Sequence, residues 1–414
     1  MIGLRKALHA AGHRAQYGTS RAAAISYFSV RRGLNHLVQQ QQSFRPNPCD
    51  SVAEWASRQA GCSVTEIFPP RLLTRSPPRT IEPNIHPKYL ERMVVHHRRK
   101  YIVPIHGARI VGSSGLIRLP DKMYAVEAAY SRENLNREFR YHLDWRRRVG
   151  KKQGTYFSLI HPWSQSQNYY HWIHESLEKL YGVLEDLPKD VKFIVPSNLL
   201  PLQREMLGLL GIDDTQLALF PQDEVWELET LIFATPTFNR GTHWRDADLW
   251  LRDKILAGYG ATPSATGRRL YISRRDVPRR NLLNEEEVEK YLHGLGFETV
   301  VLSELPLKDQ VQLFSEASIV VSTMGASFVN ILFSPPGTIV VDMIPPEQMS
   351  SCYVYWEMCE GLGHQYWYFA ADSIARTDGR NDHHTVVPIE KLAATMDRLG
   401  VGVDLETPGR PPGD

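Results

Sequence analysis

The chain has 414 residues, 42% of them hydrophobic and 23% charged, which is the composition of an ordinary globular protein with room for two domains. Its formal net charge of +2 excludes a strong overall field for binding nucleic acid. No apolar run reaches the roughly 18 residues of a membrane-spanning helix, and the four cysteines form no Cys-x-x-Cys pair. We therefore expect a cytoplasmic protein without a membrane span, a disulfide framework or a zinc site.

Residues 1–90 have the features of a loose, basic leader. No Asp or Glu occurs before Asp50, whereas seven Lys or Arg residues do, and prolines interrupt residues 46–78. The seven are Arg5, Lys6, Arg14, Arg21, Arg31, Arg32 and Arg45. Such an arm is either a solvated surface or a peripheral contact with an anionic membrane, and both alternatives stay open.

Residues 91–259 are predicted to form a first α/β domain, because strand and helix patterns alternate along them. Short strand candidates occupy residues 101–126. The later elements, in chain order, are a helix over 134–148, a strand over 156–160, a helix over 169–184, a strand over 192–195, a helix over 201–210, strands over 216–220 and 229–234, and a helix over 246–259. Residues 260–267, which consist of Gly, Ala, Thr, Pro and Ser, are the predicted linker.

Residues 268–400 are predicted to form a second, Rossmann-like domain with a parallel sheet. Its expected strands cover 270–272, 299–302, 319–322 and 338–343, and its expected helices cover 285–295, 308–317 and 328–333. Parallel sheets bind ligands at the carboxyl ends of their strands. Arg274 and Arg275 follow the first of these strands, where one guanidinium can contact a pyrophosphate while the other pairs with Asp276 or Glu285.

A second feature of this edge is the small-residue turn of Gly325, Ala326 and Ser327, which opens a helix containing Asn330. Small residues let the backbone N–H groups at a helix start approach an anion closely. Together with the arginines, the turn predicts a cradle for a nucleoside diphosphate, in which cations stabilise the leaving group. The alternative for the turn is simple packing.

The first domain carries a compact histidine and carboxylate pattern. His171 and Glu175 are four residues apart on a predicted helix and so share one face. They are candidates for an acid–base pair in which Glu175 takes a proton and His171 orients it or acts instead. Asn168 and His174 are candidate acceptor-cleft residues. The alternative is a helix start capped by Asn168 with structural hydrogen bonds, and no third ligand at a telling spacing supports a metal site.

Two further sequence patterns are explained better by a structural role than by ligand binding. Asp246 and Asp248 form an Asp-x-Asp pattern, but they begin a predicted helix, so helix capping explains them better than metal binding. The Tyr- and Trp-rich segment 347–368 is interpreted as core rather than as a surface that stacks on sugars.

Several of these sequence words also resemble glycosyltransferase family 61. The matching words are Arg269-Leu-Tyr-Ile-Ser-Arg-Arg-Asp276, Leu282-Leu-Asn-Glu285, Gly294-Leu-Gly-Phe297, Gly325-Ala326 followed by Asn330, Phe333-Ser-Pro-Pro-Gly-Thr338, and the upstream Asn168-Tyr-Tyr-His-Trp-Ile-His-Glu175. The resemblance spans roughly residues 101–346. It departs from the family at Met324, where the family commonly has His.

The resemblance implies a GT-B-like fold of two facing Rossmann-like domains. It also implies an inverting, metal-independent transfer of a sugar from a nucleotide donor, a UDP-sugar, to a glycan or glycolipid acceptor in surface polysaccharide synthesis, with no cofactor besides the donor. The alternatives are a non-catalytic binding module derived from such an enzyme, which Met324 favours, and another polysaccharide-modifying transferase.

Overall fold

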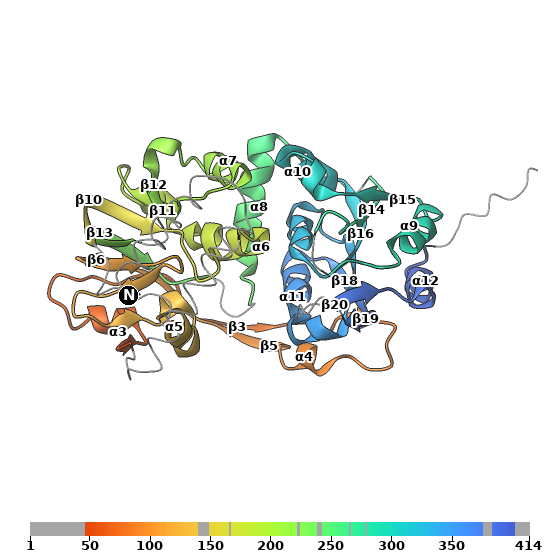
Figure 1. The fold of residues 1–414 in the computed structure, drawn as a ribbon, viewed down its shortest axis with the longest axis horizontal. Coiled ribbons are helices and arrows are strands. Elements are labelled where there is room, and N and C mark those ends of the chain that lie inside the picture. Colours follow the sequence, from red (N-terminus) through yellow and green to blue (C-terminus); the bar gives the residue numbers. More distant parts are fainter. Residues whose placement is uncertain are drawn as a thin grey trace, which may run out of the picture.

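The computed structural model describes residues 46–139, 149–164, 167–221, 224–237, 242–264, 266–277, 280–375 and 383–401. Its elements gather in two α/β halves that lie side by side (Figure 1). The arm over residues 1–45, for which we predict a membrane contact, lies outside the described residues. The predicted helix over 134–148 is described only as α5, Arg132–Phe139.

The second half is built on a parallel sheet, as the sequence predicts. Within the described residues this sheet has six strands in the order β15-β14-β16-β17-β18-β4, and every neighbouring pair is parallel. The strands are β4 (Arg79–Thr80), β14 (Arg268–Ile272), β15 (Phe297–Val300), β16 (Ala317–Thr323), β17 (Ile339–Ile344) and β18 (Gln365–Ala370). Central strands such as β16 and β17 are almost wholly buried, which is why their sequences are mostly apolar.

Helices connect and cover these strands. They are α9 (Glu285–His293), α10 (Leu307–Ser315), α11 (Tyr353–Leu362), α12 (Ile389–Arg398) and the 3₁₀ helices η8 (Leu302–Glu304), η9 (Ala326–Phe333) and η10 (Pro346–Ser351). A small antiparallel pair, β19 (Asp372–Ala375) and β20 (His383–Val386), lies beside them. The aromatic segment 347–368 supplies core residues, including Trp356 and Tyr368, which confirms that interpretation.

The first half has a mixed sheet, so the expectation of a Rossmann-like parallel sheet holds there only in part. Among the described residues it has ten strands. They are β1 (Pro48–Cys49), β2 (Thr65–Phe68), β6 (Lys100–His106), β7 (Arg109–Val111), β8 (Leu116–Arg118), β9 (Tyr124–Ala125), β10 (Val149–Ser158), β11 (Lys192–Pro196), β12 (Leu217–Phe220) and β13 (Val225–Ala234). Only β12-β11-β10-β13 and the pair β1-β9 are parallel.

The antiparallel part of this sheet follows from short connections. Residues 112–115 join β7 to β8, and Gly112 and Gly115 adopt φ values of 66° and 62°, which favour glycine. Such a connection is too short for a parallel crossover, which needs about a dozen residues or more. The helices of this half are α3 (Val52–Ala56), η1 (Glu127–Ala129), α5, α6 (Tyr169–His171), η4 (Trp172–Ser176), η5 (Leu177–Leu180), η6 (Leu184–Asp186), α7 (Pro201–Leu209), η7 (Asp214–Gln216) and α8 (Arg245–Tyr259).

Residues 46–90 are not a loose leader, and this part of the prediction is wrong. They contribute β1 and β2 to the first sheet and β4 to the second, and the short helix α4 (Pro87–Leu90) carries the fully buried Tyr89. The antiparallel ribbon of β3 (Arg71–Thr74) and β5 (Val94–His97) lies between the halves (Figure 1). Proline density hid this arrangement because proline breaks long elements but tolerates short extended ones at sheet edges.

The two halves share one apolar core. Leu251 and Ile255 of α8 belong to the same buried cluster as Phe328 and Ile331 of η9. On α11, the buried Glu357 forms ion pairs with Arg75, which follows β3, and with Arg92, which precedes β5.

The predicted domain boundary at residues 260–267 stays a prediction. None of the helices in the described part of the chain is long and apolar enough to cross a membrane.

Candidate functional site

The site begins at the helix that follows β10. Asn168 caps this helix, because its Oδ1 accepts hydrogen bonds from Tyr170 N at 2.9 Å and from His171 N at 3.4 Å. The next turn, Trp172–Ser176, is π-helical, and the element ends as a 3₁₀ turn at Leu180. The predicted regular helix over 169–184 is therefore interrupted. Isolated π turns are rare and occur frequently at functional sites.

His171 and Glu175 meet across this turn, as their spacing predicts. His171 Nδ1 lies 2.5 Å from Glu175 Oε1. The His171 side chain is 27% exposed, whereas the Glu175 side chain is 1% exposed. Of the two groups, His171 is thus the one that an acceptor molecule can reach.

His161 and Tyr130 complete the surroundings of Glu175. His161 Nδ1 lies 3.3 Å from Glu175 Oε2, but it already accepts a hydrogen bond from Trp163 N at 3.1 Å. Burial opposes the ionisation of Glu175, yet the contacts with His161 and His171 outweigh it and lower the pKa of this carboxyl. Glu175 is therefore an ionised, buried partner for His171.

Tyr130 is a residue that the sequence analysis missed. Burial, followed by the nearby Glu175 carboxylate, raises the pKa of its hydroxyl. Its backbone has a φ of 65°, which is strained for a bulky residue, and residues with such strain cluster at functional sites. A cavity of about 40 Å³ borders Tyr130 and is also lined by Arg98 and Thr237. The positive φ is not readable from sequence, so no signal identified this residue.

In the second half, Arg274 and Gly325 lie against each other. The Arg274 side chain is buried, and a Cβ added at Gly325 would overlap Arg274 Nη1 and lie 2.9 Å from Arg274 Cζ. Burial, with the charge of Arg280, lowers the pKa of Arg274 to about 10, so the guanidinium keeps its charge at neutral pH. Within the described residues its Nε has no hydrogen-bond partner. The chain thus holds a cation beside the small-residue turn.

Arg275 points elsewhere, as expected for adjacent residues at a strand end. It forms an ion pair with Glu289 of α9, and its Nε donates to Ser273 Oγ at 2.9 Å. The predicted partner, Asp276 or Glu285, is wrong in detail. Glu285 instead accepts hydrogen bonds from Ser273 Oγ at 2.6 Å and from Arg274 N at 3.2 Å, which fixes the start of the loop.

The turn itself leads into a 3₁₀ helix rather than an α-helix. Gly325 O accepts a 2.5 Å hydrogen bond from Tyr355 of α11, while Ala326 and Ser327 remain partly exposed. Asn330, expected to contact the donor, is 1% exposed. Its Oδ1 accepts from Tyr169 at 2.9 Å and its Nδ2 donates to Gln310 at 2.9 Å, so both ends of its amide are engaged at the junction of the halves.

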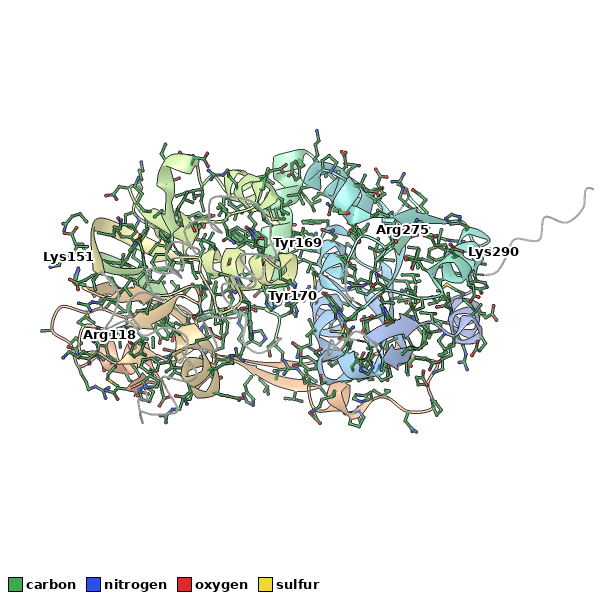
Figure 2. The ribbon with its side chains drawn as sticks, viewed as in Figure 1. Arg118, Lys151, Tyr169, Tyr170, Arg275 and Lys290 are labelled. Carbon is green, nitrogen blue, oxygen red and sulfur yellow. The ribbon has the colours of Figure 1, made fainter. Side chains whose placement is uncertain are left out.

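Tyr170 connects the two groups of predicted residues. Its ring lies 5.5 Å from the ring of His171 and 5.8 Å from the ring of Tyr355, which in turn holds Gly325. Figure 2 shows Tyr169 and Tyr170 at the end of the first half that faces the second. The fold therefore brings the histidine-bearing helix and the arginine-bearing edge to one junction.

Asp246 and Asp248 diverge, and the capping interpretation is wrong. The N-cap of α8 is Trp244, without a side-chain cap. Asp246 pairs with Arg71 on the surface at 2.8 Å, while Asp248 is fully buried and faces His174. Residues two apart on a helix point in different directions. His174, expected in an acceptor cleft, is likewise fully buried.

Asp342 in β17 is a buried acid near Arg274. Its Oδ2 accepts a hydrogen bond from Tyr366 at 3.0 Å, and its side chain is fully buried. Burial raises its pKa from the ordinary 3.8 to about 8, although the Tyr366 hydrogen bond and the charge of Arg274 oppose the rise. Between these two pH values the folded chain retains a proton that the unfolded chain has released.

We therefore expect Asp342 to make the protein less stable as pH rises from about 4 to about 8. This group alone removes about 1.4 kcal/mol of unfolding free energy per pH unit. Asp342→Asn stays neutral, so its advantage over the parent should grow across this window in urea unfolding at several pH values. Asp190→Asn, at an exposed turn, is the control. A difference between parent and Asp342→Asn that does not change with pH would contradict the burial argument.

Comparison with known proteins gives one family match. No curated protein matches the chain. The family model described as Glycosyltransferase 61 matches residues 169–341, a segment that begins at Tyr169 of α6 and ends within β17. It includes His171, Glu175, Arg274 and Gly325. Residues 169–341 of the chain are therefore similar to glycosyltransferase family 61.

Proposed function

We propose that the protein transfers a sugar from a nucleotide donor, a UDP-sugar, to a glycan or glycolipid acceptor by one inverting displacement without a catalytic metal ion. The observation that carries this proposal is the junction at which Arg274 and Gly325 of the second half meet the His171 helix of the first through Tyr170 and Tyr355. The family match supports the sugar-transfer chemistry. Two facing domains of the GT-B type are part of the same proposal.

On the donor side, Arg274 is proposed to bind the diphosphate. Its guanidinium is buried beside the turn of Gly325, Ala326 and Ser327, where the first backbone N–H groups of η9 begin. The leaving diphosphate gains negative charge in the transition state, and a fixed cation in a water-poor site stabilises that charge without reorganising. Arg275 is proposed to support the loop through Glu289, and Asn330 to fasten the two halves.

On the acceptor side, we propose that His171 is the base and Glu175 its positioning partner. This exchanges the roles expected from sequence. The support is exposure: His171 is accessible and Glu175 is not. A buried carboxylate against Nδ1 fixes the tautomer with Nε2 unprotonated and stabilises the imidazolium that forms when Nε2 takes the acceptor proton. The cavity beside Tyr130 is a candidate approach for the acceptor.

The test is turnover with a panel of sugar nucleotides and glycan acceptors. We expect one UDP-sugar to be consumed in the presence of acceptor, with inversion at the anomeric carbon seen by NMR. Turnover should be unchanged by a short exposure to EDTA. Loss of turnover that added Mn²⁺ restores would contradict metal independence, and retention of configuration would contradict the single displacement.

A second candidate is a non-catalytic module that binds a sugar nucleotide. The observation that favours it is Met324, which is buried in the shared core directly before Gly325, where the family commonly has His. Binding of a donor without turnover by any acceptor would support this candidate. The proposal of a sugar-transferring enzyme includes a cytoplasmic role in surface polysaccharide synthesis, with peripheral contact to a membrane.

A further inference from the structure

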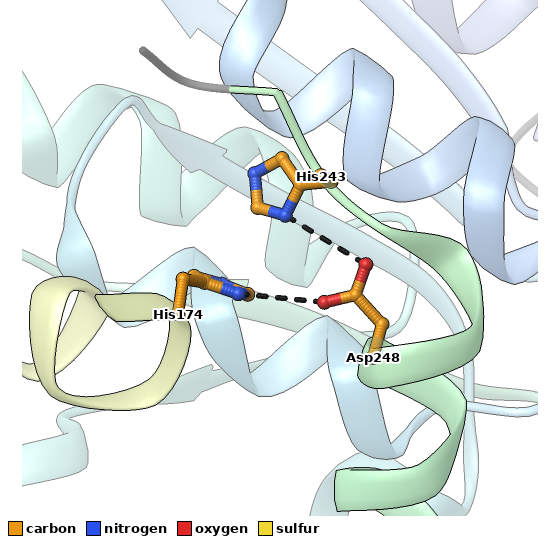
Figure 3. A group of neighbouring side chains, drawn as sticks. All are labelled: His174, His243 and Asp248. Atoms are coloured by element: carbon orange, nitrogen blue, oxygen red, sulfur yellow. Dashed lines mark ion pairs between the residues drawn. The ribbon is translucent and has the colours of Figure 1, made fainter. Parts of the chain in front are cut away.

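A second cluster of ionisable side chains lies in the interior, on the buried side of the helical segment that carries His171. His174 in η4, His243 before α8 and Asp248 in α8 face one another (Figure 3). Glu178 in η5 joins them through its contact with His174. Their exposures are 0% for His174, Glu178 and Asp248 and 2% for His243. Sugar transfer as proposed above uses none of them, because groups without access to solvent cannot contact donor or acceptor.

The spacing of the cluster suits a tetrahedral metal ion. His174 Nδ1 lies 3.4 Å from Asp248 Oδ1, and His243 Nδ1 lies 3.7 Å from Asp248 Oδ2. One ligand atom from each of His174, His243 and Asp248 falls within 4.8 Å of the others. With metal–ligand bonds of about 2.0–2.1 Å, the edge of a tetrahedron is about 3.3 Å. The observed gaps are near this edge and longer than ordinary hydrogen bonds.

The carboxylates provide a second, independent observation. Both oxygens of Asp248 and Oε2 of Glu178 are buried and accept no hydrogen bond in the described part of the chain. Asp248 has instead the longer contacts with His174 and His243 given above. Leaving a buried polar group unsatisfied costs roughly 1–3 kcal/mol, and more when the group is charged. Such oxygens call for an explanation, and a bound cation is one of them. Two carboxylates and two neutral imidazoles together match the charge of a divalent ion.

The neighbours orient the ring of His243. Its Nε2 lies 2.8 Å from the Tyr170 hydroxyl. When Nε2–H donates to the Tyr170 oxygen, the lone pair of Nδ1 points toward Asp248. A metal-binding histidine usually makes such an outer hydrogen bond with the ring nitrogen that does not bind the metal. His174 Nδ1 forms a 2.6 Å hydrogen bond with Glu178 Oε1. A shared metal ion would replace this bond and separate the two atoms to about 3.3 Å.

We propose that His174, Glu178, His243 and Asp248 bind one divalent transition-metal ion, with Zn²⁺ favoured by the nitrogen and oxygen ligands, in a closed structural site. Structural zinc sites have four protein ligands and leave no position for substrate. The ion fastens the π turn to α8 and thereby holds His171 and Glu175 in place. The site is separate from the proposed donor site at Arg274, so it is compatible with the metal-independent transfer proposed above.

The direct test is metal analysis of the full chain, purified without a histidine tag and without chelators. We expect about one equivalent of metal per chain, as for a closed structural site. Protein unfolded with a chelator and refolded with Zn²⁺ should regain the ion and melt at a higher temperature than protein refolded without it. Co²⁺ in place of Zn²⁺ should give the visible absorption of a tetrahedral site.

Variants assign the ligands. Asp248→Asn should lose the metal and the Zn²⁺-dependent rise in melting temperature, whereas His293→Ala, at an exposed histidine of α9, should keep both. If Asp248→Asn fails to fold, the metal content and the melting temperatures of the parent protein still test the proposal. No stoichiometric metal in the parent, either as purified or after refolding with Zn²⁺ or Co²⁺, would overturn the proposal and leave an internal ion-pair network. Retention of metal by a folded Asp248→Asn would also overturn it.

Discussion

Replacing His171 with alanine is expected to slow sugar transfer by roughly 10²- to 10⁴-fold, the usual scale for losing a general base. Donor affinity, measured by calorimetry with UDP, should stay at the parent value, because Arg274 and the turn at Gly325 are unchanged. The physical reason is that His171 is the exposed member of the pair, at 27% against 1% for Glu175. Its Nε2 is the basic atom that an acceptor hydroxyl can approach.

Glu175→Gln should cause a smaller loss of turnover. Glutamine keeps an oxygen that accepts from His171 Nδ1, so the ring stays oriented, but it no longer stabilises the imidazolium with a negative charge. The loss should appear in kcat rather than in KM. Added imidazole should partly rescue His171→Ala and should not rescue Glu175→Gln, a difference that simple destabilisation would not produce.

His293→Ala serves as the matched histidine control, since this residue is exposed on α9 and contacts Thr299. It should leave turnover unchanged. A larger loss in Glu175→Gln than in His171→Ala would return the role of base to Glu175, as the sequence suggested. Full activity in both folded variants would mean that residues 168–175 have only a structural role and that the base lies elsewhere.

The sequence predicted the second half well because its signals are local. The apolar runs of β14, β16 and β17 and the small residues after β16 specify a parallel sheet and its ligand-binding edge. Because the carboxyl ends of neighbouring parallel strands meet at one edge, Arg274 and Gly325 could be expected to approach each other. The structure places them in contact.

The remaining features depend on long-range packing and carry no local signal. His174, in the π turn at Trp172–Ser176, lies 3.4 Å from Asp248, which is more than seventy residues away in the sequence. No periodicity in either segment indicates this contact. The strand β4 joins the second sheet against Trp367 from almost three hundred residues earlier. Spacing alone also cannot tell which of His171 and Glu175 is buried, and that difference decides which of them is accessible to an acceptor.

The second large effect is expected at the contact between Arg274 and Gly325. Arg274→Ala should weaken UDP binding about tenfold or more, because a charge-assisted hydrogen bond contributes roughly 1.5–3 kcal/mol. Gly325→Ala should cause a comparable loss although it removes no donor group. The new methyl group would overlap Arg274 Nη1, so the guanidinium has to leave its position beside the turn.

Matched variants separate this mechanism from general damage. Arg275→Ala removes the adjacent arginine, which pairs with Glu289 and is half exposed, and should bind UDP nearly as the parent does. Gly208→Ala adds a methyl group to α7 where no atom lies within 4 Å, and should be neutral. Melting temperatures of all variants establish that affinity is compared between folded proteins.

The double variant decides whether the two residues act together. If Gly325→Ala acts only by displacing Arg274, adding it to Arg274→Ala should cost little more, so the two losses should be far from additive. Additive losses would mean that the turn binds the diphosphate independently through its own backbone N–H groups. Parent-like UDP affinity in Arg274→Ala, together with a loss in Arg275→Ala, would move the diphosphate site to the α9 side of the loop. Parent-like affinity in all variants would remove this strand edge as the donor site.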